Sequence, residues 1–390
     1  MGLSEAYIVA ATRTAGGRRG GRLSGWHPSD LAGSVLDSLV ERAGIDGAAV
    51  DDVILGCVTQ AGEQSLHIGR NAVLSSSLPQ SVPAVTIDRQ CGSSQQALHF
   101  AAQAVMSGTQ DMVIACGVES MTRVPMGLAI SPDSSPVGPW SEKVQERFGV
   151  KEFSQFGGAE MIARKYGFDR EQLDAFGLLS QQRAAAASKA GAFDDEITPI
   201  EIVTADGSHE VHTVDEGIRF DATQESIAGV KLLMEGGTLT AATSSQVCDG
   251  ASGVIVVNER ALKEHNLTPL ARVHSMTVTA GDPVIMLEEP VFATQRALER
   301  AGMKIEDIDL YEVNEAFAPV PLAWLQAIGA DPDRLNVNGG AIALGHPLGA
   351  SGTKLMTTLI HALRAQGKRY GLQTMCEGGG VANVTIVEAL

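Results

Sequence analysis

Positively charged residues are scarce in this chain relative to acidic ones. Its 29 lysines and arginines are outnumbered by 46 aspartates and glutamates, and the formal net charge is −17. Such a charge argues against nucleic acid as a partner, although basic side chains can still gather around a small anionic ligand. Apolar runs of membrane-spanning length are also lacking, so we expect no membrane span.

Cysteine is sparse too, with five residues at irregular spacing. An odd, unpatterned set argues against a disulfide framework and for reduced thiols in a cytosolic setting. A strand-like run at residues 6–10 leaves no room for a secretory signal peptide, and the final Glu388-Ala-Leu is no peroxisomal address. We therefore expect a cytoplasmic protein.

What the chain does have is length and apolar content. Its 390 residues, of which 44% are hydrophobic, suffice for two or more packed domains. Strand-like segments, such as residues 53–55 and 112–116, alternate with helix-like ones, which is typical of a mostly parallel sheet covered by helices on both faces. Residues 120–243 break this pattern, and we interpret them as an insertion.

Cys91 stands on a turn between a strand-like run and a helix-like run. Residues 82–87 are apolar and β-type, and residues 97–106 are helix-like and end at Gly108. This order places Cys91 at or near a helix N-terminus, where the helix dipole favours the thiolate, the nucleophilic form of cysteine. A buried, inert cysteine is the competing interpretation.

Two further reactive residues stand on glycine-rich turns in the last third of the chain. His346 lies in Gly345-His-Pro-Leu-Gly-Ala-Ser-Gly352, after an apparent short strand from Asn336 and before helix-like residues 353–363. Cys376 ends a strand and opens the cluster Cys376-Glu-Gly-Gly-Gly380. Two cysteines and a histidine on such turns are the components of covalent thiol chemistry.

The last third of the chain also repeats the pattern of the first. Asp52-Val-Ile-Leu precedes Cys91 by 39 positions, and Asp307-Ile-Asp-Leu precedes His346 by the same 39. A repeat of this length predicts two similar halves related by a pseudo-twofold axis. The two glycine turns would then meet near that axis, which would bring Cys91 and His346 together.

These segments resemble the thiolases, enzymes that make or break 3-ketoacyl-CoA. The motifs that carry the resemblance are Cys91-Gly-Ser-Ser, Gly117-Val-Glu-Ser-Met, Asn314-Glu-Ala-Phe, the His346 segment and the Cys376 cluster, and the match covers essentially the whole chain. The resemblance implies an α/β thiolase fold, in which two similar βαβαβαββ halves form five αβαβα layers. The domains would be residues 1–119 with 244–270, an inserted loop domain 120–243, and residues 271–390.

The resemblance also assigns a role to each reactive residue. Cys91 would be the acylated nucleophile, and His346 its base and one oxyanion-hole donor. Asn314 would hold a water that completes this hole, although it could equally cap a helix beginning at Glu315. Cys376 would be the acid/base that deprotonates the incoming CoA thiol and protonates the leaving acetyl-CoA enolate. The backbone N–H groups of Cys91 and Gly378 would bind the acyl-enzyme oxygen.

Coenzyme A would enter as a substrate, with no bound cofactor and no metal. The resemblance places Ser245 at the pantetheine and Arg219 and Ser226 at the nucleotide end. Many relatives carry a histidine where this chain has Phe153-Ser-Gln-Phe-Gly-Gly, and this departure favours degradation and a bulkier acyl group. Glu377 is a second departure, which could raise the pKa of Cys376 or point away from it.

Several alternatives stay open from the sequence. The chain could be a biosynthetic acetoacetyl-CoA thiolase or a non-catalytic acyl-CoA or sterol carrier on the same fold. A decarboxylating condensing enzyme would show His or Asn at the position of Cys376. The main prediction is thiolytic cleavage of 3-ketoacyl-CoA by a homodimer or homotetramer, with residues 124–149 reaching toward a partner subunit.

Overall fold

Strands and helices alternate along most of the chain in the computed structural model, which describes residues 4–130, 138–204 and 206–390. The strands are β1 Tyr7–Thr14, β2 Gly17–Arg18, β3 Asp52–Gly56, β4 Ala84–Ile87, β5 Met112–Ser120, β6 Ile197–Thr198, β7 Ile200–Val203, β8 His209–His212, β9 Cys248–Val257, β10 Ala271–Ala280, β11 Leu310–Val313, β12 Tyr370–Glu377 and β13 Val381–Ala389. The helices are α1 Pro28–Ala43, α2 Ile68–Leu74, α3 Ser93–Ser107, α4 Glu142–Phe148, α5 Gln155–Tyr166, α6 Arg170–Lys189, α7 Gln224–Ala228, α8 Glu259–Glu264, α9 Glu289–Ala301, α10 Pro319–Ile328, α11 Ala341–Leu344 and α12 Ser351–Ala365.

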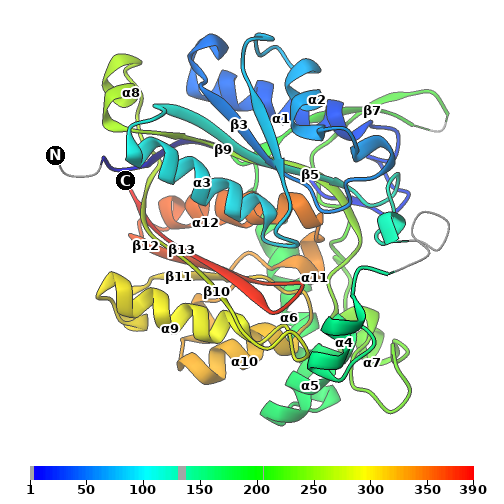
Figure 1. The fold of residues 1–390 in the computed structure, drawn as a ribbon. Coiled ribbons are helices and arrows are strands. Elements are labelled where there is room, and N and C mark those ends of the chain that lie inside the picture. Colours follow the sequence, from blue (N-terminus) through cyan, green and yellow to red (C-terminus); the bar gives the residue numbers. More distant parts are fainter. Residues whose placement is uncertain (1–3, 131–137, 205) are drawn as a thin grey trace.

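These elements form five layers, as the resemblance implied. In Figure 1, α1 and α2 lie above a first group of strands, α3 and α12 lie beneath it, and a second group of strands separates these from α9 and α10. Every residue of β5 and β9 is buried, because helices cover both faces of their sheet. The expected α/β architecture is therefore present.

The two halves share one strand connectivity. The first half has the strand order β1-β9-β5-β3-β4, and the second half has the corresponding order β10-β13-β12-β11. Antiparallel pairing of Tyr7 with Arg272 and of Ile8 with Ala271 joins β1 to β10 and makes one continuous sheet. The repeat that the sequence predicted is thus visible in the connectivity.

The second half departs from the repeat at the expected strand near Asn336. Only Leu335 forms a β-bridge there, with Tyr311, and the chain then turns through Asn336 at φ 42°. The side chain of Asn336 replaces the missing strand, because its Oδ1 accepts from the Val313 N–H and its Nδ2 donates to the Val313 carbonyl, both at 2.9 Å. The prediction of a strand was wrong, and the short helix α11 follows instead.

Helices α3 and α12 form the central layer and bring their N-termini together. The Thr353 N–H donates to the hydroxyl of Ser94 at 3.0 Å. A Cβ on Gly352 would overlap the backbone nitrogen of Gln95, so this glycine permits the close approach. The glycine turns that precede the two helices consequently meet in the middle of the molecule.

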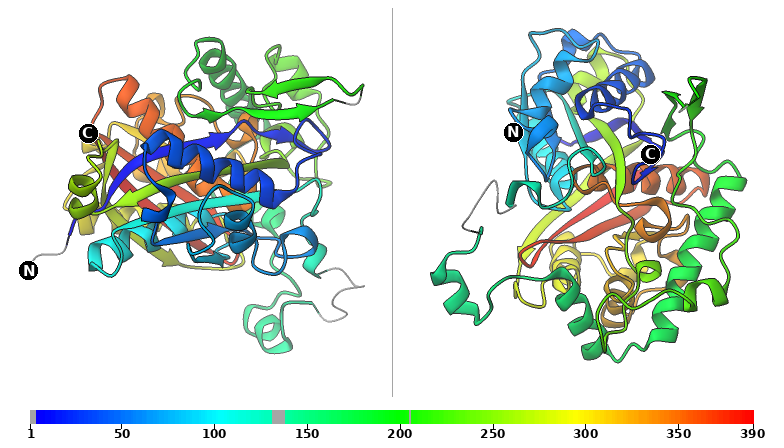
Figure 2. Two further views of the ribbon diagram at one scale, coloured as in Figure 1. Left: turned by 90° about the horizontal axis from the view of Figure 1, so that it is seen from above. Right: turned by 90° about the vertical axis from the view of Figure 1, so that its right-hand side faces the viewer.

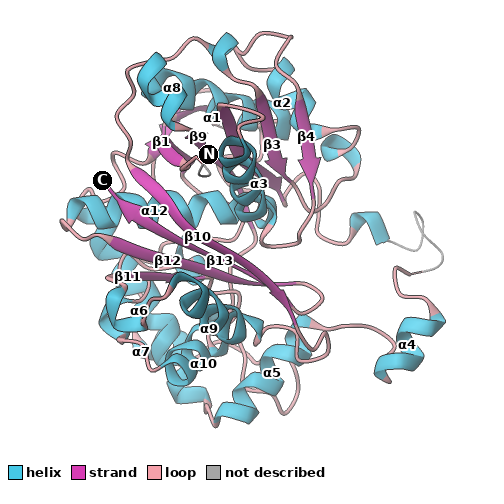
Figure 3. Ribbon diagram, turned by 60° about the vertical axis from the view of Figure 1, so that its left-hand side comes forward, coloured by secondary structure: helices cyan, strands magenta, loops and turns pink. Residues whose placement is uncertain are grey.

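The segment between β5 and β9 holds α4 to α7 and β6 to β8. Figure 2 shows this segment, in green, extending along one side of the molecule past both groups of strands. One of its strands, β6, pairs with β1 of the main sheet. Figure 3 shows α4 standing away from the body of the molecule. The division into domains at residues 119, 243 and 270 remains a prediction.

Candidate active site

Cys91 lies on the turn between β4 and α3, where the sequence placed it. Gln90 adopts a left-handed φ of 48°, and Gly92 is the N-cap of α3. The Cys91 side chain is 5% exposed and packs with Leu348, Leu355 and Met375. The tight turn therefore presents the thiol at the start of a 15-residue helix.

Burial controls the acidity of the Cys91 thiol. Desolvation raises its pKa well above the ordinary value, and the charges of Cys376 and Glu377 raise it further. Burial thus opposes the thiolate that the helix N-terminus was expected to favour. A base must therefore take the proton of Cys91 as it attacks.

His346 lies between α11 and α12 and is 4% exposed. Its Nδ1 is 2.5 Å from the hydroxyl of Ser351, and that hydroxyl donates to the Pro347 carbonyl at 2.9 Å. We therefore assign the ring hydrogen to Nδ1, which leaves the lone pair on Nε2. Burial and the charge of Lys354 lower the pKa of His346 to about 3, so the ring is neutral and can accept a proton.

Asn314 lies directly after β11 and is 1% exposed. Its Nδ2 is 3.4 Å from Nε2 of His346, and its Oδ1 has no hydrogen-bond partner among the described residues. The alternative role as a helix cap is wrong, because α10 begins only at Pro319 with Ala318 as its N-cap. An unpaired buried amide oxygen is suited to holding a water.

Cys376 lies near the end of β12, and the turn after it runs against the Cys91 turn. Burial raises the pKa of Cys376 to about 12; its own N–H opposes this shift, and the charge of Glu377 adds to it. A Cβ on Gly378 would lie 2.9 Å from Oε1 of Gln90, which shows how closely the turns approach. Among the hydrogen bonds of the described residues, none uses the backbone N–H of Cys91 or Gly378 as donor.

Glu377 does not point away from the reactive thiols. Its side chain packs on the backbone of Gly92, where any Cβ would overlap the carboxyl group. The residue is fully buried, and neither carboxyl oxygen has a hydrogen-bond partner in the described part of the chain. Burial raises the pKa of Glu377 well above its ordinary value, although Arg89 opposes the shift. A carboxyl group whose protonated form is favoured by burial thus lies beside the nucleophile turn.

Two cavities meet between these turns. One, of about 560 Å³, is lined by Cys91 and Gly378 and by apolar side chains that include Trp140 and Met286. The other, of about 360 Å³, is lined by His346 and by Ser245. The residues common to both linings are Met126, Phe153, Gln155 and Leu348. The cavity beside the Cys91 thiol and the cavity beside Ser245 are therefore neighbours.

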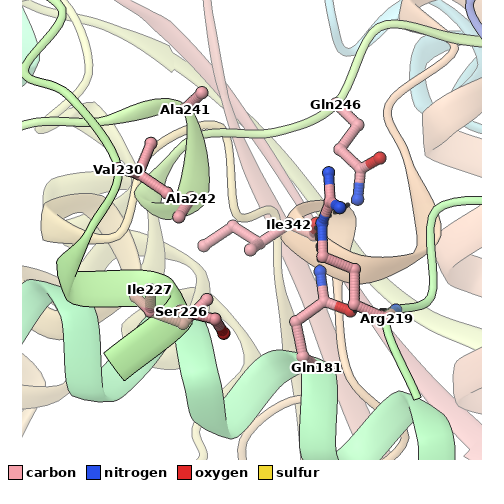
Figure 4. Close-up of a pocket in the computed structure, with 9 residues that line it drawn as sticks. All are labelled: Gln181, Arg219, Ser226, Ile227, Val230, Ala241, Ala242, Gln246 and Ile342. Atoms are coloured by element: carbon pink, nitrogen blue, oxygen red, sulfur yellow. Dashed lines mark hydrogen bonds between the residues drawn. The ribbon is translucent and has the colours of Figure 1, made fainter. Parts of the chain in front are cut away.

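A third cavity, of about 220 Å³, continues from the second, with Gln246 in both linings. It contains the other two residues expected to contact coenzyme A, Arg219 and Ser226. Figure 4 shows Arg219 beside Gln246, with Ser226 across the opening near Ile227. The hydroxyl of Ser226 also accepts from the N–H of Thr223, the N-cap of α7, so it has a structural partner as well. The three expected CoA contacts thus line two neighbouring cavities.

Both halves of the chain match thiolase family models. Residues 6–260 match the thiolase N-terminal domain, and residues 267–389 match the thiolase C-terminal domain. The chain belongs to the thiolase family. Its similarity to individual thiolases extends over their full length. The chain is 51% identical to the steroid 3-ketoacyl-CoA thiolase FadA6 of Mycobacterium tuberculosis, over 100% of this chain and 95% of that protein.

Solved structures agree with this family. The thiolase superposes on the crystal structure of human mitochondrial 3-ketoacyl-CoA thiolase with a TM-score of 0.89 and 36% identity, covering 99% of each chain. It superposes on the Bacillus anthracis acetyl-CoA acetyltransferase with a TM-score of 0.91 and 34% identity, covering 100% of each chain. The predicted thiolase fold and the acyltransferase class are confirmed.

Some residues of the thiolase site were not found from the sequence. Ser351 belongs to a motif that was recognised, but its bond to His346 depends on how the chain turns after Pro347. Met126 and Trp140 lie in a segment with no helical or strand period, so nothing in the sequence marks them as cavity residues. Lys354 has the pattern of an ordinary helix residue and is nevertheless buried.

Metal sites and membrane-spanning helices were searched for in the part of the thiolase that the structure describes. Within residues 4–130, 138–204 and 206–390, no group of three or more His, Cys, Asp or Glu side chains could hold a metal ion. None of the helices in these ranges combines the length and apolar character needed to cross a bilayer.

Proposed function

We propose that this thiolase cleaves 3-ketoacyl-CoA through an acyl-Cys91 intermediate, with His346 and Cys376 as its two proton-transfer groups. The observation that carries the proposal is that Cys91 and the β12–β13 turn line one cavity and His346 lines its neighbour, while Cys376, near the end of β12, lies close enough to Cys91 to raise its pKa. All three reactive side chains are at least 95% buried. Such a site excludes bulk water from a thioester that water would hydrolyse.

In the first half-reaction, Cys91 attacks the 3-keto carbon of the substrate. Nε2 of His346 takes the thiol proton, which suits a neutral ring with its lone pair on that nitrogen. The bond between the α-carbon and the 3-keto carbon breaks, and acetyl-CoA leaves as its enolate. Cys376 gives its proton to the enolate carbon, and the shortened acyl group remains on Cys91 as a thioester.

In the second half-reaction, coenzyme A replaces acetyl-CoA. The Cys376 thiolate takes the proton of the CoA thiol, whose sulfur attacks the acyl carbon. The bond to Cys91 breaks, and the imidazolium of His346 returns a proton to the Cys91 thiolate. Every group then has its starting proton, so the cycle is balanced and reversible.

Two sets of donors would stabilise negative oxygen during these steps. The N–H groups of Cys91 and Gly378, which donate to no other described group, face the acyl oxygen. Protonated His346 and a water on Asn314 serve the thioester oxygen of acetyl-CoA, consistent with the unpaired Oδ1 of Asn314. Ser245, Arg219 and Ser226 hold coenzyme A along the two neighbouring cavities that they line.

We propose a bulky, ring-bearing acyl group as the physiological substrate, and degradation as the physiological direction. The cavity beside Cys91 measures about 560 Å³ and has apolar walls that include Met126, Ile130, Trp140 and Met286. A relative with 51% identity is named a steroid 3-ketoacyl-CoA thiolase, which supports this choice over a biosynthetic enzyme for acetoacetyl-CoA. We also propose a cytoplasmic location, because the chemistry needs reduced thiols and all five cysteines are free.

The experiment has two parts. Steady-state cleavage is measured with linear 3-ketoacyl-CoAs of four to sixteen carbons and with ring-bearing ones, and the ring-bearing compounds should give the highest kcat/KM. The enzyme is also incubated with substrate and without free CoA, and its peptides are weighed by mass spectrometry. We expect one acyl mass, on the peptide that contains Cys91.

Variants separate the roles of the two cysteines. Cys91→Ser should lose cleavage and acyl labelling while still binding CoA, because only the nucleophile is removed. Cys376→Ala should lose turnover and keep detectable labelling of Cys91. An acyl mass on Cys376 would reverse the two assignments, and a preference for acetoacetyl-CoA would favour the biosynthetic alternative.

A further inference from the structure

Four charged side chains are buried together behind His346. Arg13 of β1 donates from Nε to Oε1 of Glu196 at 2.5 Å and from both terminal nitrogens to Asp215 at 2.8 and 3.1 Å. The ammonium of Lys354, on α12, is 3.8 Å from Asp215 Oδ1. All four residues are at least 94% buried, and two positive charges balance two negative ones.

Lys354 connects this cluster to the loop that carries the base. Its Nζ donates to the carbonyl of Leu344 at 2.5 Å and to that of Gly345 at 3.2 Å. These are the two peptide groups immediately before His346. The backbone N–H of His346 itself donates to Gln246 at 3.0 Å, so the residue is held from both sides.

The loop backbone is closely packed at this point. Gly345 adopts a φ of 80°, and a Cβ there would lie 2.6 Å from Cys248 Sγ, so the backbone passes through a narrow gap. A conformation of this kind persists only where surrounding groups fix it. The ammonium group, with three donors and two carbonyls within reach, supplies that constraint.

We propose that Lys354 is a positioning residue for His346, and that Asp215 of the inserted segment holds its ammonium against the His346 loop. The proposal rests on the proposed function of His346 as the base. Asp215 precedes Arg219 by four residues, so one short segment reaches both the base loop and the cavity expected to hold the nucleotide end of coenzyme A. Docking of the inserted segment and placement of the base are thereby linked.

The positive charge of Lys354 also disfavours protonation of His346. Burial and Lys354 both lower the pKa of His346. The charged and titratable groups that bear on Lys354 itself are Asp215, Glu196 and Cys248, which raise its pKa, and Arg13, which lowers it along with burial. Glu312 and Lys354 line one small cavity, and burial raises the pKa of Glu312 well above its ordinary range. Removal of the lysine charge should therefore make His346 easier to protonate.

The test compares Lys354→Met, Lys354→Arg and Thr358→Val in the full-length enzyme, with the best substrate of the panel. Thr358 is the matched control, because it lies one turn along α12 and its hydroxyl donates to Glu196 at 2.9 Å rather than to the backbone of the His346 loop. We expect Lys354→Met to lower kcat about 10- to 100-fold, the scale of a misplaced catalytic group, with KM within about threefold. In the pH profile of kcat/KM for Lys354→Met, the midpoint of the acidic limb should rise by about one pH unit.

Lys354→Arg should recover most of kcat and leave the acidic limb unmoved, because it retains the charge. Thr358→Val should keep kcat within about threefold even if its melting temperature falls as much as that of Lys354→Met. Should Lys354→Met fail to fold, Asp215→Asn takes its place, since it releases the ammonium while conserving size, and the same fall in kcat is expected.

Three results would overturn the proposal. The first is a folded Lys354→Met or Asp215→Asn enzyme with kcat within threefold of wild type. The second is an equal loss of kcat in Thr358→Val, which would make the effect one of stability. The third is failure of Lys354→Arg to recover activity in a folded enzyme. A His346→Ala enzyme that still acylates Cys91 would instead refute the base assignment, independently of Lys354.

Discussion

At the scale of single residues, hydrogen bonds on both ring nitrogens decide what His346 can do. The Ser351 hydroxyl fixes the hydrogen on Nδ1, and Asn314 faces Nε2. A neutral ring with this tautomer is prepared to accept a proton from Cys91 and then to donate it to an oxyanion. With the hydrogen on Nε2, that nitrogen would be a donor and could not take the proton of the thiol.

Ser351→Ala tests this arrangement. Loss of the hydroxyl leaves Nδ1 without an acceptor and frees the other tautomer, so we expect kcat to fall about 5- to 10-fold, the value of one hydrogen bond. Thr357→Val is the control, because its hydroxyl bonds only the Thr353 carbonyl within the same helix. Steady-state cleavage and thermal melting of both variants are measured. Equal kcat in Ser351→Ala and the control would contradict the assigned tautomer.

Glu377 gives a prediction on pH and stability. Its pKa is raised in the folded protein, so the folded state holds a proton that the unfolded state releases above about pH 4.3. Stability therefore falls as pH rises from that value toward the folded pKa. Glu377→Gln lacks this loss, and we expect a higher melting temperature than wild type at pH 7 to 8 and little difference near pH 4.

Activity separates this structural effect from catalysis. Glu377→Gln should keep cleavage within about 10-fold of wild type, because a neutral amide resembles the neutral acid in size and polarity. Loss of acylation in a folded Glu377→Gln enzyme would place Glu377 in the catalytic machinery. A melting temperature below wild type at neutral pH would mean that the carboxyl group is paired and charged.

The reactive residues on glycine turns could be predicted from the sequence, because a nucleophile, a base and an acid each need a particular side chain. The side chains that surround those residues could not be predicted. Strand alternation would let Glu377 point away from the sulfur, yet its side chain reaches Gly92 because two turns converge there. The burial of Lys354 likewise depends on Asp215, 139 positions earlier in the chain.

At the scale of elements, the contact of α3 with α12 sets the distance between the two halves of the site. Periodicity predicted both helices, and the structure begins each a few residues earlier than expected. Periodicity could not predict that the side chain of Asn336 would replace a strand. Its amide makes the hydrogen bonds that a neighbouring backbone would make, and such a residue leaves no apolar pattern in the sequence. Local signals thus located the helices better than the connection between them.

Gly352→Ala tests the helix contact. The added methyl group overlaps the backbone nitrogen of Gln95, so α3 and α12 must separate. We expect a loss of about 1–3 kcal/mol in the free energy of unfolding and a marked loss of cleavage. Gly25→Ala is the control, because a Cβ there meets nothing within 4 Å. Urea unfolding and kcat are measured; a stable, fully active Gly352→Ala would show that the helices tolerate a wider spacing.

At the scale of the whole molecule, apolar side chains remain exposed on the first half. Val85 of β4, Leu74 of α2 and Phe100 of α3 are each at least 40% exposed, and β4 is the last strand of its half-sheet. Met126 and Ile130 are exposed in the segment that precedes α4. Residues 131–137 belong to the segment 124–149 that we expected to reach toward a partner subunit, and they lie outside the described residues. An unpaired strand edge with apolar neighbours favours association.

We therefore predict a homodimer, or a homotetramer built from two dimers. Light scattering coupled to gel filtration should give at least twice the chain mass of 40.8 kDa. Val85→Lys, which places a charge on the β4 edge, should shift the protein toward monomer at low micromolar concentration. A monomer at every concentration, with wild-type activity, would refute the prediction.

The side chain of Asn336 also has a consequence for self-association. Strand β11 is the other end of the continuous sheet, and an open edge of this kind can recruit a strand from another molecule. Asn336 satisfies the N–H and the carbonyl of Val313, and its own backbone N–H bonds the Tyr311 carbonyl. The edge is closed by a single amide and one short loop, so the sheet is terminated against fibril-like growth at β11.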